Sequence, residues 1–71
     1  MNDRNRSLIT ARLNEIPKIM KKITQAWFDF HGAIGIPANN SGELRIKAQI
    51  MIDHTNECLQ RLKEIMSLID K

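Results

Sequence analysis

Few residues of this 71-residue chain carry reactive side chains. The one local cluster pairs His54 with Cys58, which would lie one helical turn apart. A thiolate and an imidazole at this spacing suit a nucleophilic site or half of a zinc site, but both require further ligands or an oxyanion site. No nucleophile elbow and no phosphate-binding loop accompanies them. We therefore expect no enzymatic activity, no metal and no cofactor, with Cys58 packing as a small hydrophobe and His54 at the margin of the core.

Two apolar series with heptad spacing predict the elements that carry these residues, two long amphipathic helices over about 7–31 and 41–70. The first series is Ile9, Leu13, Ile16, Met20, Ile23, Trp27 and Phe30. The second is Leu44, Ala48, Met51, Thr55, Cys58, Leu62, Ile65 and Ile69, and Ile52, Leu59 and Met66 widen it. We interpret both series as core positions.

The segment between the helices holds all three glycines and one of the two prolines, which predicts a loop over 32–40. Gly32 suits a left-handed stop after His31. Asn40, followed three residues later by Glu43, matches a capping box and predicts a second helix that begins near Ser41. The whole chain, 1–71, is then a single helical-hairpin domain.

Pro17 lies inside the first predicted helix, where it removes a backbone hydrogen bond to the Leu13 carbonyl. Because the heptad register continues through Pro17, we predict a kinked first helix. A break between Asn14 and Ile16 is the alternative.

The fold class that follows is all-α, an antiparallel hairpin that pairs into a dimeric four-helix bundle. A chain of this length buries only about 60% of the surface that it exposes when unfolded, so a lone copy is marginally stable. The single cysteine excludes an internal disulfide. One hairpin also leaves half of each apolar stripe uncovered, and a second copy would cover it. We therefore expect a homodimer.

The formal net charge of +3 comes from the first half of the chain. There a basic and amide-bearing face points away from the predicted core, and it could hold nucleic acid by contacts with phosphates and bases. Its residues are Lys18, Lys21, Lys22, Gln25 and Phe28. The architecture resembles the plasmid-encoded RNA-binding hairpin dimers of the Rop type, and this resemblance implies RNA or DNA binding as an alternative function.

A second outward feature is apolar and lies at the loop end of the hairpin. Its residues are Phe28, Ile34, Ile36, Ile46 and Ile50. They form either a satellite core under the loop or a surface for a protein partner. From the second interpretation we predict a small regulatory or adaptor protein that binds an unidentified partner protein and occludes it.

The expected location is the cytoplasm, because residues 1–7 are polar and no apolar run approaches the ~20 residues that span a bilayer. A role at a membrane surface is not expected, because Trp27 belongs to the predicted core series.

Overall fold

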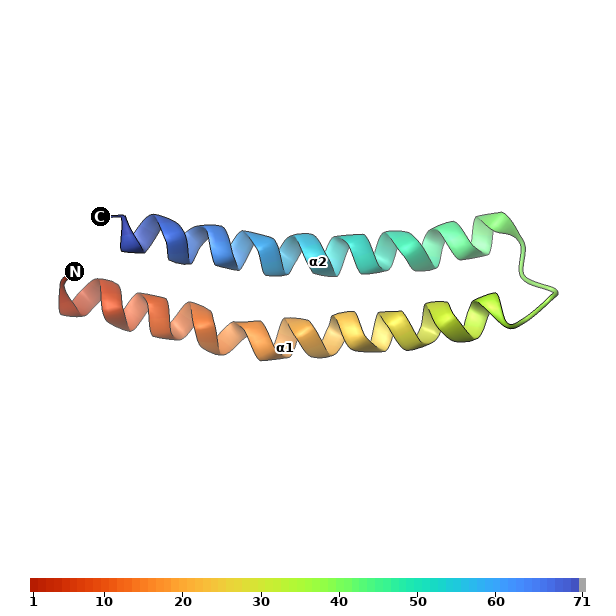
Figure 1. Cartoon of the computed structure of the whole chain (residues 1–71), viewed down its shortest axis with the longest axis horizontal. Coiled ribbons are helices and arrows are strands. Elements are labelled where there is room, and N and C mark those ends of the chain that lie inside the picture. The colour runs from red at the N-terminus through yellow and green to blue at the C-terminus, as the bar shows by residue number, and fades with distance from the viewer. Residues whose placement is uncertain (71) are drawn as a thin grey trace.

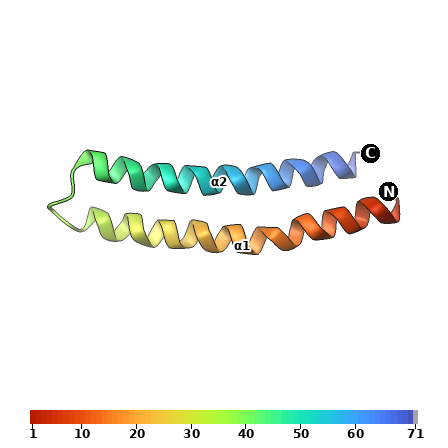
Figure 2. The same cartoon turned by 180° about the vertical axis from the view of Figure 1, so that it is seen from behind.

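Two long helices account for most of residues 1–70, the part of the chain that the computed structural model describes. They are α1 (Asp3–Ile34) and α2 (Ser41–Ile69). The helices lie side by side and antiparallel along their whole length, with the connecting loop at one end of the hairpin (Figure 1). The view from behind shows the same arrangement, with the start of α1 and the end of α2 opposite the loop (Figure 2). Residues 1–70 contain no strand, so the predicted all-α hairpin is confirmed. Lys71, the last residue of the predicted domain, lies outside the described residues.

Asparagine side chains cap both helices at their first turn. The Asn2 side-chain oxygen accepts a hydrogen bond from the Asn5 N–H at 2.7 Å, and the Asn40 oxygen accepts one from the Glu43 N–H at 3.0 Å. Such caps satisfy donors that the helix itself leaves free. The start of α2 at Ser41 is as predicted, whereas α1 begins four residues before the predicted range because Asn2 supplies a cap there.

The predicted left-handed stop at Gly32 is wrong, since no described glycine has a positive φ. Instead, α1 continues to Ile34, and Gly35 follows it in a right-handed conformation. The Ile36 N–H and the Asn39 side-chain amide both donate to the Ala33 carbonyl, at 3.2 and 2.9 Å. These bonds satisfy a carbonyl at the end of the helix, so the turn does not need a left-handed residue.

Pro17 lies within α1, which is helical without interruption on both sides of it. The alternative of a break between Asn14 and Ile16 is therefore wrong. The Pro17 side chain is exposed to solvent. The helix persists because the turns before and after Pro17 pack against α2, and this packing compensates for the missing backbone bond.

The side chains at the helix interface form what we call the inner row. In α1 they are Asn5, Ile9, Arg12, Ile16, Ile19, Ile23, Ala26, Phe30 and Ala33, and in α2 they are Leu44, Lys47, Met51, His54, Cys58, Arg61, Ile65 and Leu68. Within residues 1–70 only Ile19, Ala26, Ala33 and Ile65 are buried, and none of these is below 2% exposure. The hairpin alone therefore has a thin core.

The inner row differs from the predicted core series at every second position. Leu13, Met20 and Trp27 were expected in the core of α1 but are about half exposed, at 49, 55 and 48%. Thr55, Leu62 and Ile69 of α2 are likewise exposed. The positions shared with the prediction, such as Ile16 and Ile23, lie at the interface.

The physical reason is that each apolar stripe is wider than the contact that one neighbouring helix makes. The helices therefore pair along one edge of the stripes. At that edge Ala26 and Ala33 permit close approach, and Arg12 and Arg61 come within reach of carboxylates.

Candidate interaction surfaces

The two long sides of the hairpin have opposite chemical character. One side, which we call the charged face, carries a ring of four alternating charges made by Arg12 and Glu15 of α1 and by Arg61 and Glu64 of α2. Across the helices, Arg12 Nε lies 2.9 Å from Glu64 Oε2, and Arg61 Nε lies 2.9 Å from Glu15 Oε2. Within each helix the arginine and the glutamate are 3.6 Å apart. Each ionic group in the ring thus has two partners of opposite charge.

These pairs are electrostatic contacts rather than well-aligned hydrogen bonds. Glu15 Oε2, Glu64 Oε2 and Arg61 Nε are all shielded from solvent, yet none has a hydrogen-bond partner with acceptable geometry. The four side chains as a whole are 30–39% exposed, so water screens part of their attraction. Lys22 Nζ and Glu57 Oε1, at 3.6 Å, extend the charged face toward the loop.

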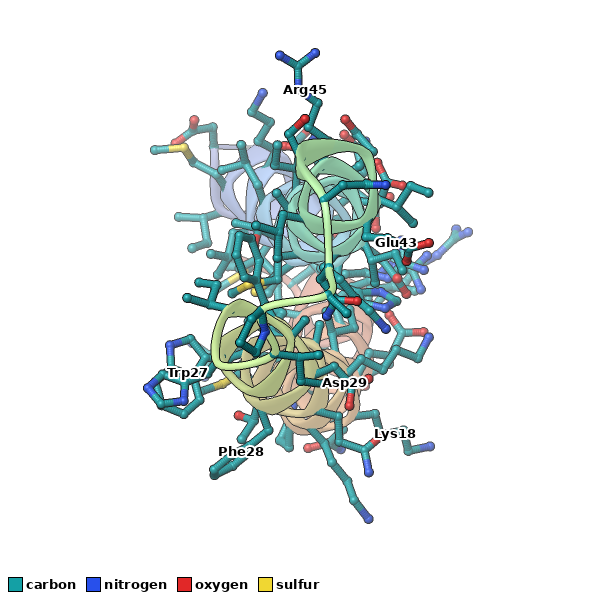
Figure 3. The ribbon with its side chains drawn as sticks, turned by 90° about the vertical axis from the view of Figure 1, so that its right-hand side faces the viewer. Lys18, Trp27, Phe28, Asp29, Glu43 and Arg45 are labelled. Atoms are coloured by element: carbon teal, nitrogen blue, oxygen red, sulfur yellow. The ribbon has the colours of Figure 1, made fainter. Side chains whose placement is uncertain are left out.

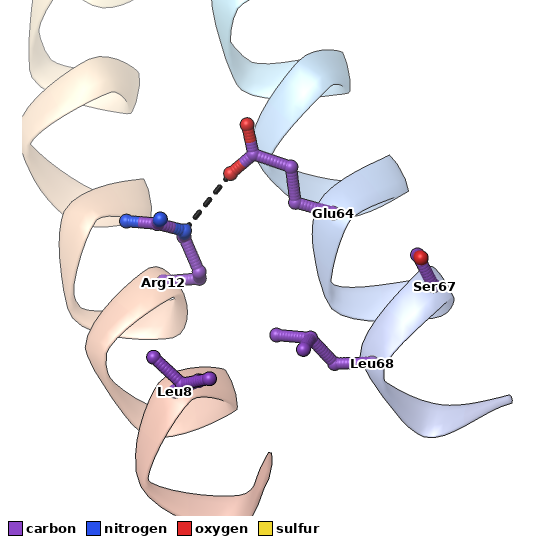
Figure 4. A pocket seen from close by; sticks show the side chains of 5 residues that line it. All are labelled: Leu8, Arg12, Glu64, Ser67 and Leu68. Carbon is purple, nitrogen blue, oxygen red and sulfur yellow. Dashed lines mark ion pairs between the residues drawn. The ribbon is translucent and has the colours of Figure 1, made fainter. Parts of the chain in front are cut away.

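A hollow of about 260 Å³ lies beside the charge ring, at the end of the hairpin where the chain begins and ends. Leu8 and Leu68 form its apolar part, and Arg12, Glu64 and Ser67 line the rest (Figure 4). Because Arg12 already pairs with two carboxylates, it offers little unsatisfied charge to an anionic ligand.

The opposite side, which we call the apolar face, consists of large hydrophobic side chains. They are Leu13, Met20, Trp27 and Ile34 of α1 and Ile52, Leu59, Leu62, Met66 and Ile69 of α2, each 46–64% exposed. Every one of them directly follows a residue of the inner row. The glutamates of the charge ring instead come three residues after Arg12 and Arg61. On each helix, these glutamates and the side chains of the apolar face therefore lie on opposite sides of the inner row. The apolar face is therefore continuous across both helices.

Trp27 marks the apolar face when the hairpin is seen along its axis, where it projects on the side opposite to Glu43 (Figure 3). Its ring stacks on His31 at a centroid distance of 5.0 Å and meets Phe28 edge-on at the same distance. With Phe30, Ile34 and Met51, the rings of Trp27 and His31 line a hollow of about 260 Å³. Both helices thus contribute to a concave and apolar end of the face.

The five side chains predicted to bind a partner protein are all exposed, but the structure does not gather them into one patch. Phe28 and Ile36 line a hollow of about 410 Å³ that also contains Asp29, Glu43 and Lys47. Ile34 lies in the other hollow with Trp27. Ile46 and Ile50 lie one turn apart on α2 and are 59 and 40% exposed.

The residues predicted to bind nucleic acid share the outer surface of α1. Lys18, Lys21, Lys22, Gln25 and Phe28 are all exposed, and Lys22 also pairs with Glu57. Lys18 borders a hollow that also contains Glu15 and Glu57. These carboxylates reduce the positive potential on that side of the lysine cluster.

His54 and Cys58 are both half-buried in α2. The nearest ionic partner of His54 is Glu57, whose Oε2 lies 3.9 Å from Nδ1. Among residues 1–70, no group of three or more side chains of the metal-binding types lies together. Neither helix within these residues contains an uncharged apolar stretch long enough to cross a bilayer.

The sequence interpretation missed the charge ring and the edge at which the helices pair. A signal for both exists, because Ile19, Ala26 and Ala33 repeat every seven residues in phase with Arg12. Arg-x-x-Glu also occurs once in each helix, at 12–15 and 61–64, and an antiparallel pair brings these two motifs together. The chain matches no protein-family model, no curated protein and no solved structure.

Proposed function

We propose that this chain is a small regulatory or adaptor protein of the cytoplasm that works as a homodimeric four-helix bundle, with α1 kinked at Pro17, and that binds and occludes a partner protein. The observation that carries the proposal is the apolar face, where nine large side chains remain about half exposed. Monomeric proteins rarely expose a contiguous apolar surface of this extent, and such surfaces are typical of interaction sites. The proposal assigns the chain no catalytic role.

The proposed kink is supported by the exposure of the Pro17 side chain, which follows the inner-row residue Ile16 and is not part of the contact with α2. Loss of the backbone bond to Leu13 lets the helix bend away from the proline ring and toward the inner row. A bend in this direction keeps both halves of α1 in contact with α2.

The partner-binding surface in this proposal is the loop end, with Phe28, Ile34, Ile36, Ile46 and Ile50 as contact residues. Ile46 and Ile50 are its most testable members, because they are exposed on one helix and lie outside both the inner row and the apolar face. Side chains of this kind supply binding energy when a partner removes them from water.

The test is the double variant Ile46→Ser/Ile50→Ser, expressed in the native host, with the associated proteins identified by mass spectrometry. We expect the variant to keep its helical circular dichroism and its molar mass but to lose the partner that the unaltered chain retains. Leu8→Ser is a matched control, since Leu8 is 39% exposed at the opposite end of the hairpin. Full retention of every partner by the double variant would exclude this surface.

Nucleic-acid binding of the Rop type is the second candidate function, and the outer surface of α1 supports it. Lys18 and Lys21 are exposed there beside Gln25 and Phe28, and Lys22 is adjacent. A complex held by phosphate contacts weakens steeply with salt and loses part of that salt dependence when the lysines are replaced. We expect Lys18→Gln/Lys21→Gln to reduce binding to a folded RNA in a filter assay if this function is correct. An absence of binding to both RNA and DNA at low salt would dismiss it.

A further inference from the structure

We propose that a second copy of this chain occupies the apolar face from Leu13 to Trp27 of α1 and from Ile52 to Ile69 of α2, so that this part of the face is the dimer interface and Ile34 stays with the partner-binding surface at the loop end. The charged face and the outer isoleucines Ile46 and Ile50 then remain outside the interface. This inference rests on the proposed homodimer and specifies the surface through which it forms.

The exposed area of the hairpin is the first reason. A compact folded monomer of 8.2 kDa is expected to expose about 4500 Å². The hairpin exposes 5545 Å², roughly 1000 Å² more than that scaling gives. A standard protein interface buries about 800 Å² on each partner. The surplus is thus of the size that one copy would bury in a stable dimer.

The elongated shape leads to the same conclusion. The radius of gyration is 16.5 Å, against about 11 Å for a compact domain of this length. The hairpin measures 55 × 16 × 9 Å, so it is one helix thick in its shortest direction. A second hairpin stacked on the apolar face would double that thickness and complete a four-helix arrangement.

Three threonine hydroxyls that border the apolar face are already satisfied, so a partner can approach without leaving them unpaired. The hydroxyls of Thr10, Thr24 and Thr55 donate to carbonyls of their own helices, at 3.0, 3.0 and 2.7 Å. Each of these threonines, like the residues of the apolar face, directly follows an inner-row residue. Contact with another apolar surface therefore buries no free hydroxyl donor at these three positions.

The distribution of charge favours a second copy over a lipid surface. An interfacial helix pair holds lysines at the rim of its apolar face, where they meet anionic headgroups. Here Thr10, Pro17 and Thr24 lie along the middle of the α1 side of the face and the basic residues Arg6 and His31 only at its ends, whereas Lys22 pairs with Glu57 on the charged face. Two copies joined through their uncharged faces keep their charged faces turned outward, away from each other.

Oxidation of the methionines in the unaltered chain tests this interface without any mutation. Met20 and Met66 belong to the apolar face and Met1 does not, yet all three are similarly exposed in the hairpin, at 55, 64 and 59%. At concentrations where the chain is dimeric, we expect hydrogen peroxide to oxidise Met20 and Met66 at least about fivefold more slowly than in dilute solution, because burial limits access to the sulfur. The rate for Met1 should not change.

A pair of isoleucine variants in α2 provides the second test. Ile52, on the apolar face, and Ile46, outside it, are 50 and 59% exposed, so they are matched in type, helix and exposure. We expect Ile52→Glu to weaken dimerisation by about 100-fold in sedimentation equilibrium, because a charge at an interface must be desolvated. Ile46→Glu should change it less than about threefold, as is usual for a residue outside an interface.

The two proposals fail in different ways. A dimer in which Met20 and Met66 stay as reactive as in dilute solution would overturn this interface while leaving the proposed homodimer in place. Equal effects of Ile52→Glu and Ile46→Glu would also overturn it. A chain that remains monomeric at every concentration would overturn both proposals. Should Ile52→Glu fail to fold, the methionine rates of the unaltered chain decide the question.

Discussion

The charged face and the apolar face flank the same inner row. The hairpin pairs the ionic groups of the charged face but leaves the hydrophobic side chains of the apolar face about half exposed. On the charged face, Arg12, Glu15, Arg61 and Glu64 find all of their ionic partners inside the hairpin. On the apolar face, side chains such as Trp27 and Met66 have their neighbouring helix on one side and water on the other. Electrostatic pairing is local and complete in one copy, whereas one copy leaves the large hydrophobic side chains of the apolar face about half exposed.

The two faces also respond to different conditions. Ion pairs between partly exposed groups weaken as salt is added. A larger fraction of chains forms an apolar interface at high protein concentration, and this fraction is comparatively indifferent to salt. Stability measured against concentration and against salt therefore separates their contributions.

We expect the largest effect, a fall in apparent stability, from dilution, because dilution dissociates a second copy from the apolar face. For a dimer whose folding and association are coupled, a 1000-fold dilution lowers the apparent stability by about 4 kcal/mol per dimer. Thermal melts followed by circular dichroism over this range would show the fall. The emission of Trp27, the only tryptophan, should shift to the red over the same range. A melting temperature that does not depend on protein concentration would contradict the view that the apolar face is covered by a second copy.

The next largest effect should come from the inner row that both faces share. Ile19 is 3% exposed, so Ile19→Ala leaves a cavity and should lower the free energy of unfolding by about 3 kcal/mol in urea titrations. Ile50→Ala, at an exposed position of α2, is the control and should cost far less. Similar losses for the two variants would mean that the inner row is not the core.

A glycine substitution outside both faces should change the free energy of unfolding by a smaller amount. Gly32 lies in the last turns of α1, and a Cβ there would meet nothing within 4 Å. Gly32→Ala should therefore raise the free energy of unfolding by about 0.8 kcal/mol, because alanine is the better helix former. At Gly42 a Cβ would meet the capping Asn40 Oδ1 at 3.2 Å, so Gly42→Ala should gain less. The ranking fails if Gly42→Ala is the more stabilising change in thermal melts.

The smallest effect should come from the charge ring, despite its four contacts. Glu64→Gln should cost about 0.5 kcal/mol at low salt and nearly nothing at about 0.5 M salt, since the groups are partly exposed and screened. Lys63→Gln, at the exposed neighbouring position, is the matched control and should show no such salt dependence. A loss above about 2 kcal/mol that persists at high salt would show that the ring is more strongly shielded than its exposure indicates.

Several elements of the hairpin followed from local patterns in the sequence. The cap at Asn40 and the start of α2 at Ser41 were predicted correctly, because a capping residue acts within one turn. The end of α1 was predicted three residues too early, at His31, because bonds from Ile36 and Asn39 stabilise its last turn and these depend on the path of the loop. For the five predicted partner-binding residues the sequence left open a satellite core or a docking surface; the structure exposes them, and their separation around the loop end follows from the longer α1.

The heptad pattern by itself determined that two helices form, that they are amphipathic and that a hairpin joins them, because periodicity and turn residues act locally. Only the tertiary structure decided which edge of each stripe faces the other helix. A repeat of apolar residues defines one side of a helix, but a stripe wider than one neighbour admits more than one pairing. In this hairpin the close approach at Ala26 and Ala33, together with the contacts of Arg12 and Arg61 across the helices, selected the edge that leaves Trp27 and Leu62 outside.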